Sequence, residues 1–348
     1  MEPSPKRKRL LRLALVLGAL PLAFAAGELY LRLFRPVQHL ALSEPGPEDE
    51  WKSYLHRASS VPGLAYELAP GAEQRKYGVE NRTNGHGMRD LEPVTDAEGE
   101  LARIAVLGDS VTFGFGVPEE STYPRVLEVL LNERQPGGAG RLYDVLNFGV
   151  GGYSTRDEAL VLEHKALAFE PDLVIVGYSL NDPEIEPFQP LHTHYLEPAW
   201  WRHSHLLRLA HKALRQRDVE RLGGGDYHRY LHAHPAKWKS VEQAFADIRR
   251  VADGAGCDVL VAIFPQVMKR GWAEYPYHEI HAQVAAAARA AGLLALDLLE
   301  PFSRQPQQSL RVSPGDAHPS AAGHAIAAQA IADYLAERPV LLLRRDRR

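Results

Sequence analysis

The feature that most constrains the fold is an alternation of short apolar runs and amphipathic segments, which begins at Arg103. The apolar runs predict strands at 103–109, 143–149, 172–179, 258–265 and 293–298. The amphipathic segments predict helices at 121–135, 155–169, 241–256, 277–292 and 320–337. Apolar strands that alternate with helices form a parallel sheet covered on both faces. The chain is therefore expected to adopt an α/β fold with an open, doubly wound, flavodoxin-like sheet of five strands.

Length and composition fit one large domain with additional segments better than two equal domains. The chain has 348 residues, of which 45% are hydrophobic and 24% are charged, as in ordinary globular proteins. Its formal net charge of −4 gives no reason to expect nucleic acid as a partner. The single cysteine, Cys257, excludes an internal disulfide but does not identify the cellular compartment.

The N-terminus has the layout of a signal peptide or a signal anchor. The basic residues Lys6–Arg9 precede an uncharged, mostly apolar stretch, Leu13–Ala26. This stretch is shorter than the roughly 20 residues that span a bilayer, but a snorkelling Arg12 side chain would lengthen it. Residues 1–35 are expected to be a signal anchor. The alternatives are a signal peptide cleaved after Ala23–Ala25 and an amphipathic helix of a cytosolic protein. Either export signal places the bulk of the chain outside the cytoplasm.

Three other stretches do not fit the alternation. Residues 36–101 are rich in Pro, Gly and charge, and indicate an irregular extension of turns and short extended pieces. Residues 183–234 are expected to be a partly helical insertion over the mouth of the sheet. Residues 339–348 are expected to be a basic C-terminal tail. The main domain is therefore predicted at 102–338.

Four residues that could take part in catalysis lie at the same expected edge of the sheet. Ser110 follows the first strand, Gly152 the second and Asn181 the third, and His318 lies in the loop before the last helix. Because the carboxyl ends of parallel strands meet at one edge, the fold is expected to bring them together. Taken singly, the serine fits a helix N-cap, the glycine and asparagine fit turns, and the histidine fits a solvated loop. Their joint placement favours a site.

Each of these residue types has a role in acyl transfer. A serine hydroxyl is a weak nucleophile until a base removes its proton, and imidazole suits that base because it titrates near neutral pH. Attack on a carbonyl creates an oxyanion, which needs hydrogen-bond donors already in place. The expected donors are the backbone N–H groups of Ser110 and Gly152 and the side-chain amide of Asn181. Glycine at 152 also lets the backbone approach a substrate closely.

The stretches around these residues resemble the sequence blocks of the SGNH hydrolases, the GDSL-type esterase family. They are GDSVTFG, NFGVGGYST, GYSLND and DAHPSAAGH, and the resemblance covers about residues 102–336. NGHGMRD and the N-terminal apolar segment are similar to a membrane-anchored bacterial branch. The resemblance implies a three-layer αβα fold that hydrolyses acyl esters without a metal or cofactor. It also implies Ser110 as nucleophile, His318 as base, and Ser110, Gly152 and Asn181 as oxyanion hole.

One position departs from the pattern of this family. The family usually places an acid three residues before the histidine, where this chain has Gly315. Asp316 lies only two residues before His318. Either a tighter loop lets Asp316 reach Nδ1 of His318, or the site is a Ser–His dyad in which a backbone carbonyl orients the imidazole.

Other titratable residues are expected to have supporting roles or none. Asp109 and Asp182 adjoin the expected nucleophile and amide donor and are expected to support the site, whereas Asp297 is expected to be structural. The histidine pairs at i, i+2 have no Cys or clustered acid beside them, so no metal site is expected. These pairs are His192/His194, His203/His205 and His232/His234. The chain also has neither a G-x-G-x-x-G turn between strand and helix nor a G-x-S-x-G elbow.

Together these features predict a membrane-tethered serine esterase outside the cytoplasm, or a secreted one if the signal is cleaved. The expected substrate is an acyl ester, with O-acetylated carbohydrate as one candidate because an enzyme in the cell envelope has polysaccharide nearby. An O-acyltransferase acting on envelope polysaccharide is an alternative, since only the acceptor differs. A catalytically silent glycan-binding protein is a third, although such a protein need not keep all four residues. The sequence does not indicate an oligomeric state.

Overall fold

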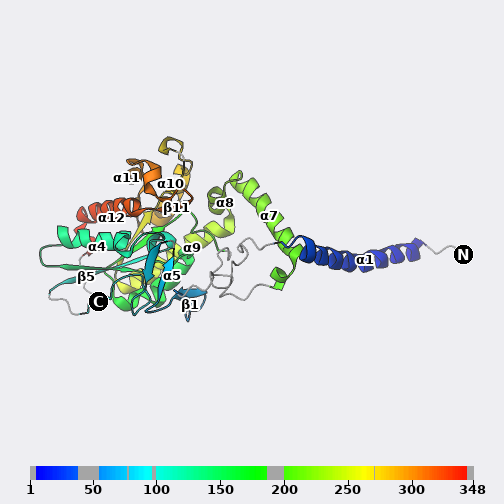
Figure 1. The fold of residues 1–348 in the computed structure, drawn as a ribbon, viewed down its shortest axis with the longest axis horizontal. Coiled ribbons are helices and arrows are strands. Elements are labelled where there is room, and N and C mark those ends of the chain that lie inside the picture. Colours follow the sequence, from blue (N-terminus) through cyan, green and yellow to red (C-terminus); the bar gives the residue numbers. More distant parts are fainter. Residues whose placement is uncertain are drawn as a thin grey trace. The chain divides into compact units, whose positions relative to one another are not determined.

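The computed structural model describes residues 5–37, 55–76, 78–95, 99–185, 200–269 and 271–342. The chain divides into two compact units (Figure 1). The smaller unit comprises Met1–Trp51 and Pro187–Arg221, and the larger unit comprises Lys52–Glu186 and Leu222–Arg348.

The larger unit is built on a parallel sheet of five strands in the order β6-β5-β7-β8-β9. The strands are β5 Leu101–Gly108, β6 Leu142–Asn147, β7 Leu173–Tyr178, β8 Asp258–Ile263 and β9 Leu294–Asp297. Each lies close to its predicted bounds, and the order is that of a flavodoxin-like sheet. The predicted α/β fold class is confirmed.

Five helices pair with these strands, and two of them differ clearly from their predicted bounds at one end. The helices are α4 Tyr123–Arg134, α5 Thr155–His164, α9 Pro235–Ala255, α10 His278–Ala290 and α12 Ala321–Ala336. The α5 helix ends earlier than predicted, because Ala166–Phe169 forms a separate 3-10 turn. The α9 helix begins earlier than predicted, at Pro235, a residue suited to the first helical position because its fixed φ is helical.

The helices cover both faces of the sheet, which gives the three layers that were predicted (Figure 1). On one face, α4 and α12 pack together over the sheet, and their apolar side chains share a core with alternate residues of the strands. That core includes Ile104 and Val106 of β5, Leu127 of α4 and Ile331 of α12, all fully buried. The α5 and α9 helices pack against each other on the opposite face.

The strand order reverses at β5, and this reversal determines where a site can form. The chain leaves β5 for α4 and its neighbour β6 on one side, but leaves β6 for α5 and then β7 on the other side of β5. In open α/β sheets, the crevice at the carboxyl ends of the strands beside such a reversal is the usual ligand site. Ser110 follows β5, and Asn181 follows β7.

The extension before the sheet forms two antiparallel hairpins within the larger unit. β1 (His56–Ala58) pairs with β2 (Tyr66–Leu68), and β3 (Glu73–Lys76) pairs with β4 (Val79–Arg82). These are the short extended pieces that the composition indicated. The β2 residues and the Arg89 side chain after the second hairpin are buried, so the extension packs on the unit instead of projecting from it.

Two further stretches differ in detail from their predicted description. The insertion contains α7 (His205–Gly223) and α8 (Tyr227–Ala233), while residues 186–199 lie outside the described residues. Part of the predicted C-terminal tail is packed: Pro339–Leu342 forms a 3-10 turn that buries Leu342, whose carbonyl accepts a hydrogen bond from Arg141. The packed domain therefore extends to Leu342, because these apolar residues close the core over α12.

The smaller unit contains the N-terminal helix α1, Pro5–Phe34. Its segment Leu17–Phe34 has a mean hydropathy of 1.3 and is long and apolar enough to cross a membrane, a criterion that a signal sequence also meets. Within this unit the Glu28 carboxylate accepts hydrogen bonds from the backbone N–H groups of His205 and Leu206. Glu28 thereby satisfies free donors at the first turn of α7.

Candidate active site

Ser110 begins a short helix directly after strand β5. Asp109 is the N-cap of this helix, α3 (Ser110–Phe113), and its Oδ1 accepts a hydrogen bond of 2.8 Å from the Val111 backbone N–H. The capping role that Ser110 might have had is therefore filled by its neighbour. The Ser110 side chain is left partly exposed at the strand edge, where a hydroxyl is accessible to a substrate.

Ser110, His318 and Asp316 form a continuous chain of hydrogen bonds. The distance from Ser110 Oγ to His318 Nε2 is 2.9 Å, and the distance from His318 Nδ1 to Asp316 Oδ1 is 2.6 Å. With Asp316 ionised, Nδ1 carries the proton and donates a hydrogen bond to the carboxylate. Nε2 is then free to accept the hydroxyl proton, which is the arrangement that a general base requires.

The local strand geometry explains why an acid two residues before the histidine reaches it. The segment predicted as a loop contains a strand, β11 (Asp316–Pro319), which pairs with β10 (Arg311–Ser313). Residues at i and i+2 of a strand point to the same side. Asp316 and His318 therefore face the same way, and Asp316 Oδ1 also accepts the His318 backbone N–H at 2.9 Å.

The electrostatics of the pair favour an ionised acid. The hydrogen bond from the His318 side chain holds the pKa of the Asp316 carboxyl below its usual value, and the His318 backbone N–H lowers it further against the effect of burial. The ring of Phe115 packs on the imidazole of His318, with ring centroids 4.5 Å apart. This contact covers one face of the imidazole and limits its rotation.

The two residues expected to complete the oxyanion hole lie beside Ser110. Gly152 has a φ of +85°, a conformation that glycine adopts without strain. A Cβ built on the preceding residue, Gly151, would lie 3.9 Å from Ser110 Cβ, so this loop runs past the serine. One N–H of the Asn181 side-chain amide donates to Asp109 Oδ2 at 3.0 Å. The amide has a second N–H, which this contact does not use.

The two expected supporting acids are buried and have different environments. Asp109 accepts hydrogen bonds from Val111 N–H, Ser179 Oγ and the Asn181 amide, so it links the loops after β5 and β7. Asp182 has one weak partner for its Oδ2, Thr155 Oγ1 at 3.4 Å, and its Oδ1 has no partner among the described residues. Burial raises the pKa of Asp182 well above its usual value.

Three residues near the site did not emerge from the sequence. Glu158 on α5 is buried, and neither of its carboxyl oxygens has a partner in the described part of the chain. Arg89 is buried and donates to the carbonyls at the end of α3, those of Phe113 and Gly114. Tyr66 of β2 donates from its hydroxyl to the Gly151 carbonyl at 2.7 Å. Arg89 lies in the NGHGMRD stretch, but a lone tyrosine in an irregular segment gave no signal.

The remaining histidines do not form a metal centre in the described part of the chain, where no group of three or more His, Cys, Asp or Glu residues is placed to hold an ion. His192 and His194 lie outside the described residues. Burial lowers the pKa of His232 to about 4, and its Nε2 lies 2.9 Å from Tyr178 Oη. Asp297 accepts from His281 Nδ1 at 2.7 Å, which fits the structural role expected of it.

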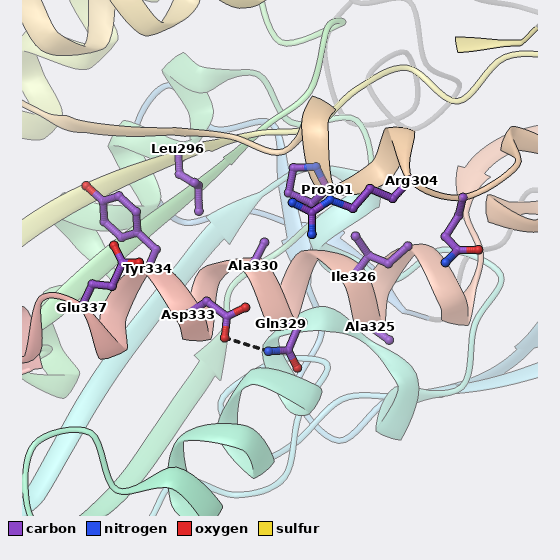
Figure 2. Close-up of a pocket in the computed structure, with 11 residues that line it drawn as sticks. Leu296, Pro301, Arg304, Ala325, Ile326, Gln329, Ala330, Asp333, Tyr334 and Glu337 are labelled. Carbon is purple, nitrogen blue, oxygen red and sulfur yellow. Dashed lines mark hydrogen bonds between the residues drawn. The ribbon is translucent and has the colours of Figure 1, made fainter.

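A groove of about 620 Å³ lies away from these residues, along α12 (Figure 2). Ile326, Ala330 and Tyr334 of α12 line it, together with Leu296 of β9 and Arg304 (Figure 2). None of the expected catalytic or oxyanion-hole residues contributes to its wall, so this groove is not part of the candidate site.

A family model described as the GDSL-like Lipase/Acylhydrolase family matches residues 106–326. No curated protein matches the chain significantly. Among solved structures, a two-domain esterase active on acetylated mannans is 19% identical over 69% of this chain, with a TM-score of 0.43, and the match spans 50% of that longer chain.

Two further solved structures match nearly their whole length. An acetylxylan esterase from Geobacillus stearothermophilus is 18% identical, with 68% of this chain and 94% of that chain covered and a TM-score of 0.43. TesA is 18% identical, with 69% of this chain and 99% of that chain covered and a TM-score of 0.44.

Proposed function

Because the chain belongs to the GDSL-like lipase/acylhydrolase family and is therefore a carboxylic ester hydrolase, we propose that it cleaves acyl esters through Ser110, His318 and Asp316. The observation that carries this proposal is the unbroken hydrogen-bond chain from Ser110 Oγ through His318 to Asp316. All three side chains are partly exposed at the carboxyl edge of the sheet, where a substrate can reach them.

The first half of the reaction forms an acyl-enzyme. His318 Nε2 takes the proton of Ser110 Oγ while Oγ attacks the ester carbonyl carbon. The carbonyl oxygen becomes an oxyanion that accepts hydrogen bonds from the N–H groups of Ser110 and Gly152 and from the Asn181 amide. Collapse of this intermediate breaks the bond to the alcohol oxygen, and the leaving alcohol takes the proton from Nε2.

The second half of the reaction releases the acid. Water enters, gives a proton to Nε2 of His318, and attacks the acyl carbon through the same oxyanion hole. Collapse breaks the bond to Oγ and returns the proton to Ser110. The Asp316 carboxylate stabilises the imidazolium that forms in each half and keeps Nε2 directed at the serine. An O-acyltransferase would differ only in the acceptor, a sugar hydroxyl in place of water.

We place the catalytic unit outside the cytoplasm, tethered by α1. The support for this proposal is the segment Leu17–Phe34 of this helix, which is long and apolar enough to cross a membrane, together with the basic residues Lys6–Arg9 before it. O-acetylated envelope carbohydrate is then the proposed substrate class, because an enzyme tethered in the cell envelope has polysaccharide nearby.

The decisive experiment compares Ser110→Ala with the wild-type chain. Ser110→Ala is expected to fold and to lose both p-nitrophenyl acetate hydrolysis and labelling by a serine-directed fluorophosphonate. Ser303→Ala, which changes a surface serine whose hydroxyl donates to the Glu300 carbonyl, is the matched control and should keep both. Labelling that survives in Ser110→Ala would move the nucleophile elsewhere.

Topology and acceptor need separate measurements. A phosphatase fused after residue 348 should be active outside the cytoplasm, and the fusion should sediment with membranes. A soluble product that begins near Ala26 would indicate a cleaved signal peptide instead. Acetylated oligosaccharide incubated with the enzyme should release free acetate, whereas transfer of the acetyl group to added sugar would indicate an acyltransferase.

A further inference from the structure

We infer that Tyr66 is a positioning residue for ester hydrolysis, which orients the Gly152 N–H by binding the carbonyl of the same peptide group. This inference rests on the proposed role of Gly152 in the oxyanion hole. Tyr66 lies in the extension before the sheet, 85 residues from Gly151, and its hydroxyl donates to the Gly151 carbonyl oxygen at 2.7 Å.

Peptide planarity makes this contact relevant to the oxyanion hole. The carbonyl of Gly151 and the N–H of Gly152 belong to one planar peptide group, and this group is trans, as are all peptide bonds in the described residues. In a trans peptide the C=O and N–H vectors point in opposite directions. A donor that fixes the direction of the Gly151 carbonyl therefore also fixes the direction of the Gly152 N–H.

The two glycines create the need for such a restraint. Neither residue has a Cβ, and Gly152 already adopts a left-handed conformation with a φ of +85°. A peptide between two glycines rotates at little steric cost, so the sequence alone does not hold the N–H in one direction. This loop also passes close to the nucleophile, since a Cβ on Gly151 would lie 3.9 Å from Ser110 Cβ.

Tyr66 is itself held in place from several sides. The residue is fully buried, and its ring contacts those of His56 and Tyr153, with centroids 5.5 Å away in each case. The Tyr153 hydroxyl donates to the Tyr66 carbonyl at 2.6 Å. The next residue, Glu67, is paired with Lys165 at 3.0 Å. The hydroxyl of Tyr66 is therefore presented to Gly151 from a rigid support.

The hydroxyl also keeps its proton over the working pH range. Burial raises the pKa of Tyr66 well above its usual value, and the nearby carboxylates of Asp157 and Asp109 raise it further. Tyr66 therefore acts as a donor, not as a proton carrier, and its effect on the reaction passes entirely through the orientation of the Gly151–Gly152 peptide.

The test is Tyr66→Phe in the full-length chain, which removes one oxygen and keeps the ring. Loss of a complete oxyanion donor costs roughly 10²–10³ in turnover, so a donor that is present but misdirected is expected to lower kcat by about 10-fold or more. KM should change by less than about twofold, because the bond to Gly152 strengthens only as the oxyanion forms. The affinity for a boronic acid that forms a tetrahedral adduct with Ser110 should fall by the same factor as kcat/KM.

The control is Tyr143→Phe, which also removes the hydroxyl of a buried tyrosine. Tyr143 lies at the start of β6, away from the carboxyl edge of the sheet, and its hydroxyl accepts a hydrogen bond from the Gly137 N–H in the loop before β6. The control variant should lose similar stability and keep wild-type kcat. Activity is expressed per site, from the extent of fluorophosphonate labelling at completion, so that a partly misfolded preparation still gives a valid kcat.

The outcomes separate this inference from the proposed function. Wild-type kcat in Tyr66→Phe, together with a large loss in Asn181→Ala, would overturn the positioning role and leave the oxyanion hole intact. Wild-type activity in both Ser110→Ala and Asn181→Ala would overturn the proposed site and with it this inference. A loss of kcat in Tyr66→Phe that is matched in Tyr143→Phe would show a general loss of stability and would also overturn the role of Tyr66.

Discussion

His318 and Asp316 face the same side of β11, so that His318 Nδ1 lies 2.6 Å from Asp316 Oδ1 although a single residue separates them. The family usually keeps its acid one residue farther away, at the position that Gly315 occupies here. An extended backbone places the side chains at i and i+2 on the same side, so an acid only two residues before the histidine can reach the imidazole. The same carboxylate oxygen also accepts the His318 backbone N–H, which fixes its position.

Replacement of Asp316 by Asn tests whether this contact makes Asp316 the acid of the triad. An amide that enforces the wrong imidazole tautomer costs about 10⁴ in turnover in a serine protease, and we expect a loss of comparable order. The loss in kcat should shrink at high pH, where hydroxide helps to remove the serine proton. Asp333→Asn, an exposed acid on α12, is the control. Activity within about threefold of wild type, less than ~1 kcal/mol in barrier, would leave a Ser110–His318 dyad.

Asn181→Ala tests the side-chain donor of the oxyanion hole. We expect kcat to fall by roughly 10²–10³ with little change in KM, because the hydrogen bond strengthens only in the transition state. Asn181 also donates to Asp109, and Ser179 Oγ donates to the same carboxylate at 3.1 Å. Ser179→Ala is therefore a matched control that loses a bond to Asp109 but no oxyanion donor. A similar loss of kcat in both variants would assign the effect to Asp109.

The sequence predicted the elements whose pattern is local. The strands of the sheet are mostly apolar runs, and residues such as Ile104 and Ile175 are fully buried in the core as that pattern indicates. The strand-end position of Ser110 followed from the same pattern. In contrast, β11 is only four residues long and pairs with β10 across a tight turn, so no periodicity showed that Asp316 and His318 share a side.

The sequence did not predict Tyr66, Arg89 and Glu158 as residues near the site, for a different reason. Tyr66 contacts Gly151 and Arg89 contacts Phe113 through hydrogen bonds that join segments far apart in the sequence. Such contacts depend on how the extension packs on the sheet, and no spacing rule within one segment predicts them. The burial of Glu158 was not predicted because an acidic residue in the first turn of a helix is also expected to stabilise the helix dipole from an exposed position.

Arg89→Met should destabilise the loop that carries the nucleophile. The guanidinium is buried and donates to the carbonyls of Phe113, Gly114 and Val117. In the variant the Gly114 carbonyl keeps the hydrogen bond from the Val117 backbone N–H, whereas the other two carbonyls lose the guanidinium donor. Each buried acceptor left unpaired costs about 1–3 kcal/mol, so the two carbonyls together should cost at least about 2 kcal/mol in the free energy of unfolding. Arg82→Met in the same extension, with exposed ion pairs, should change stability by less than about 1 kcal/mol. Equal losses in the two variants, measured by urea unfolding, would contradict a stabilising role for the Arg89 hydrogen bonds.

The buried Glu158 gives the wild-type protein a specific dependence of stability on pH. Neither carboxyl oxygen has a partner among the described residues, and burial, reinforced by the charge of Asp109, raises the pKa of Glu158 well above its usual value. The folded chain therefore keeps this proton to a higher pH than the unfolded chain, which releases it above a pKa of about 4.3. Because the folded state binds more protons in this window, the free energy of unfolding falls as pH rises through it.

Glu158→Gln removes the titration while keeping the shape of the side chain, so the difference from wild type should grow with pH. At pH 4.5 the unfolded wild-type chain has released only about half of its proton at this site, so the pH-dependent part of the difference between the two proteins should still be below about 1 kcal/mol. Towards pH 8 the free energy of unfolding of the variant should rise relative to that of the wild type by up to about 1.4 kcal/mol per pH unit, until the pKa of Glu158 in the folded wild type is reached. Glu163→Gln, a more exposed acid on the same helix that faces Arg250, should show no such growth. The measurement is denaturant unfolding of all three proteins at both pH values. A constant difference between Glu158→Gln and wild type would mean that Glu158 is ionised in the folded state, because only a proton held by the folded chain makes the difference depend on pH.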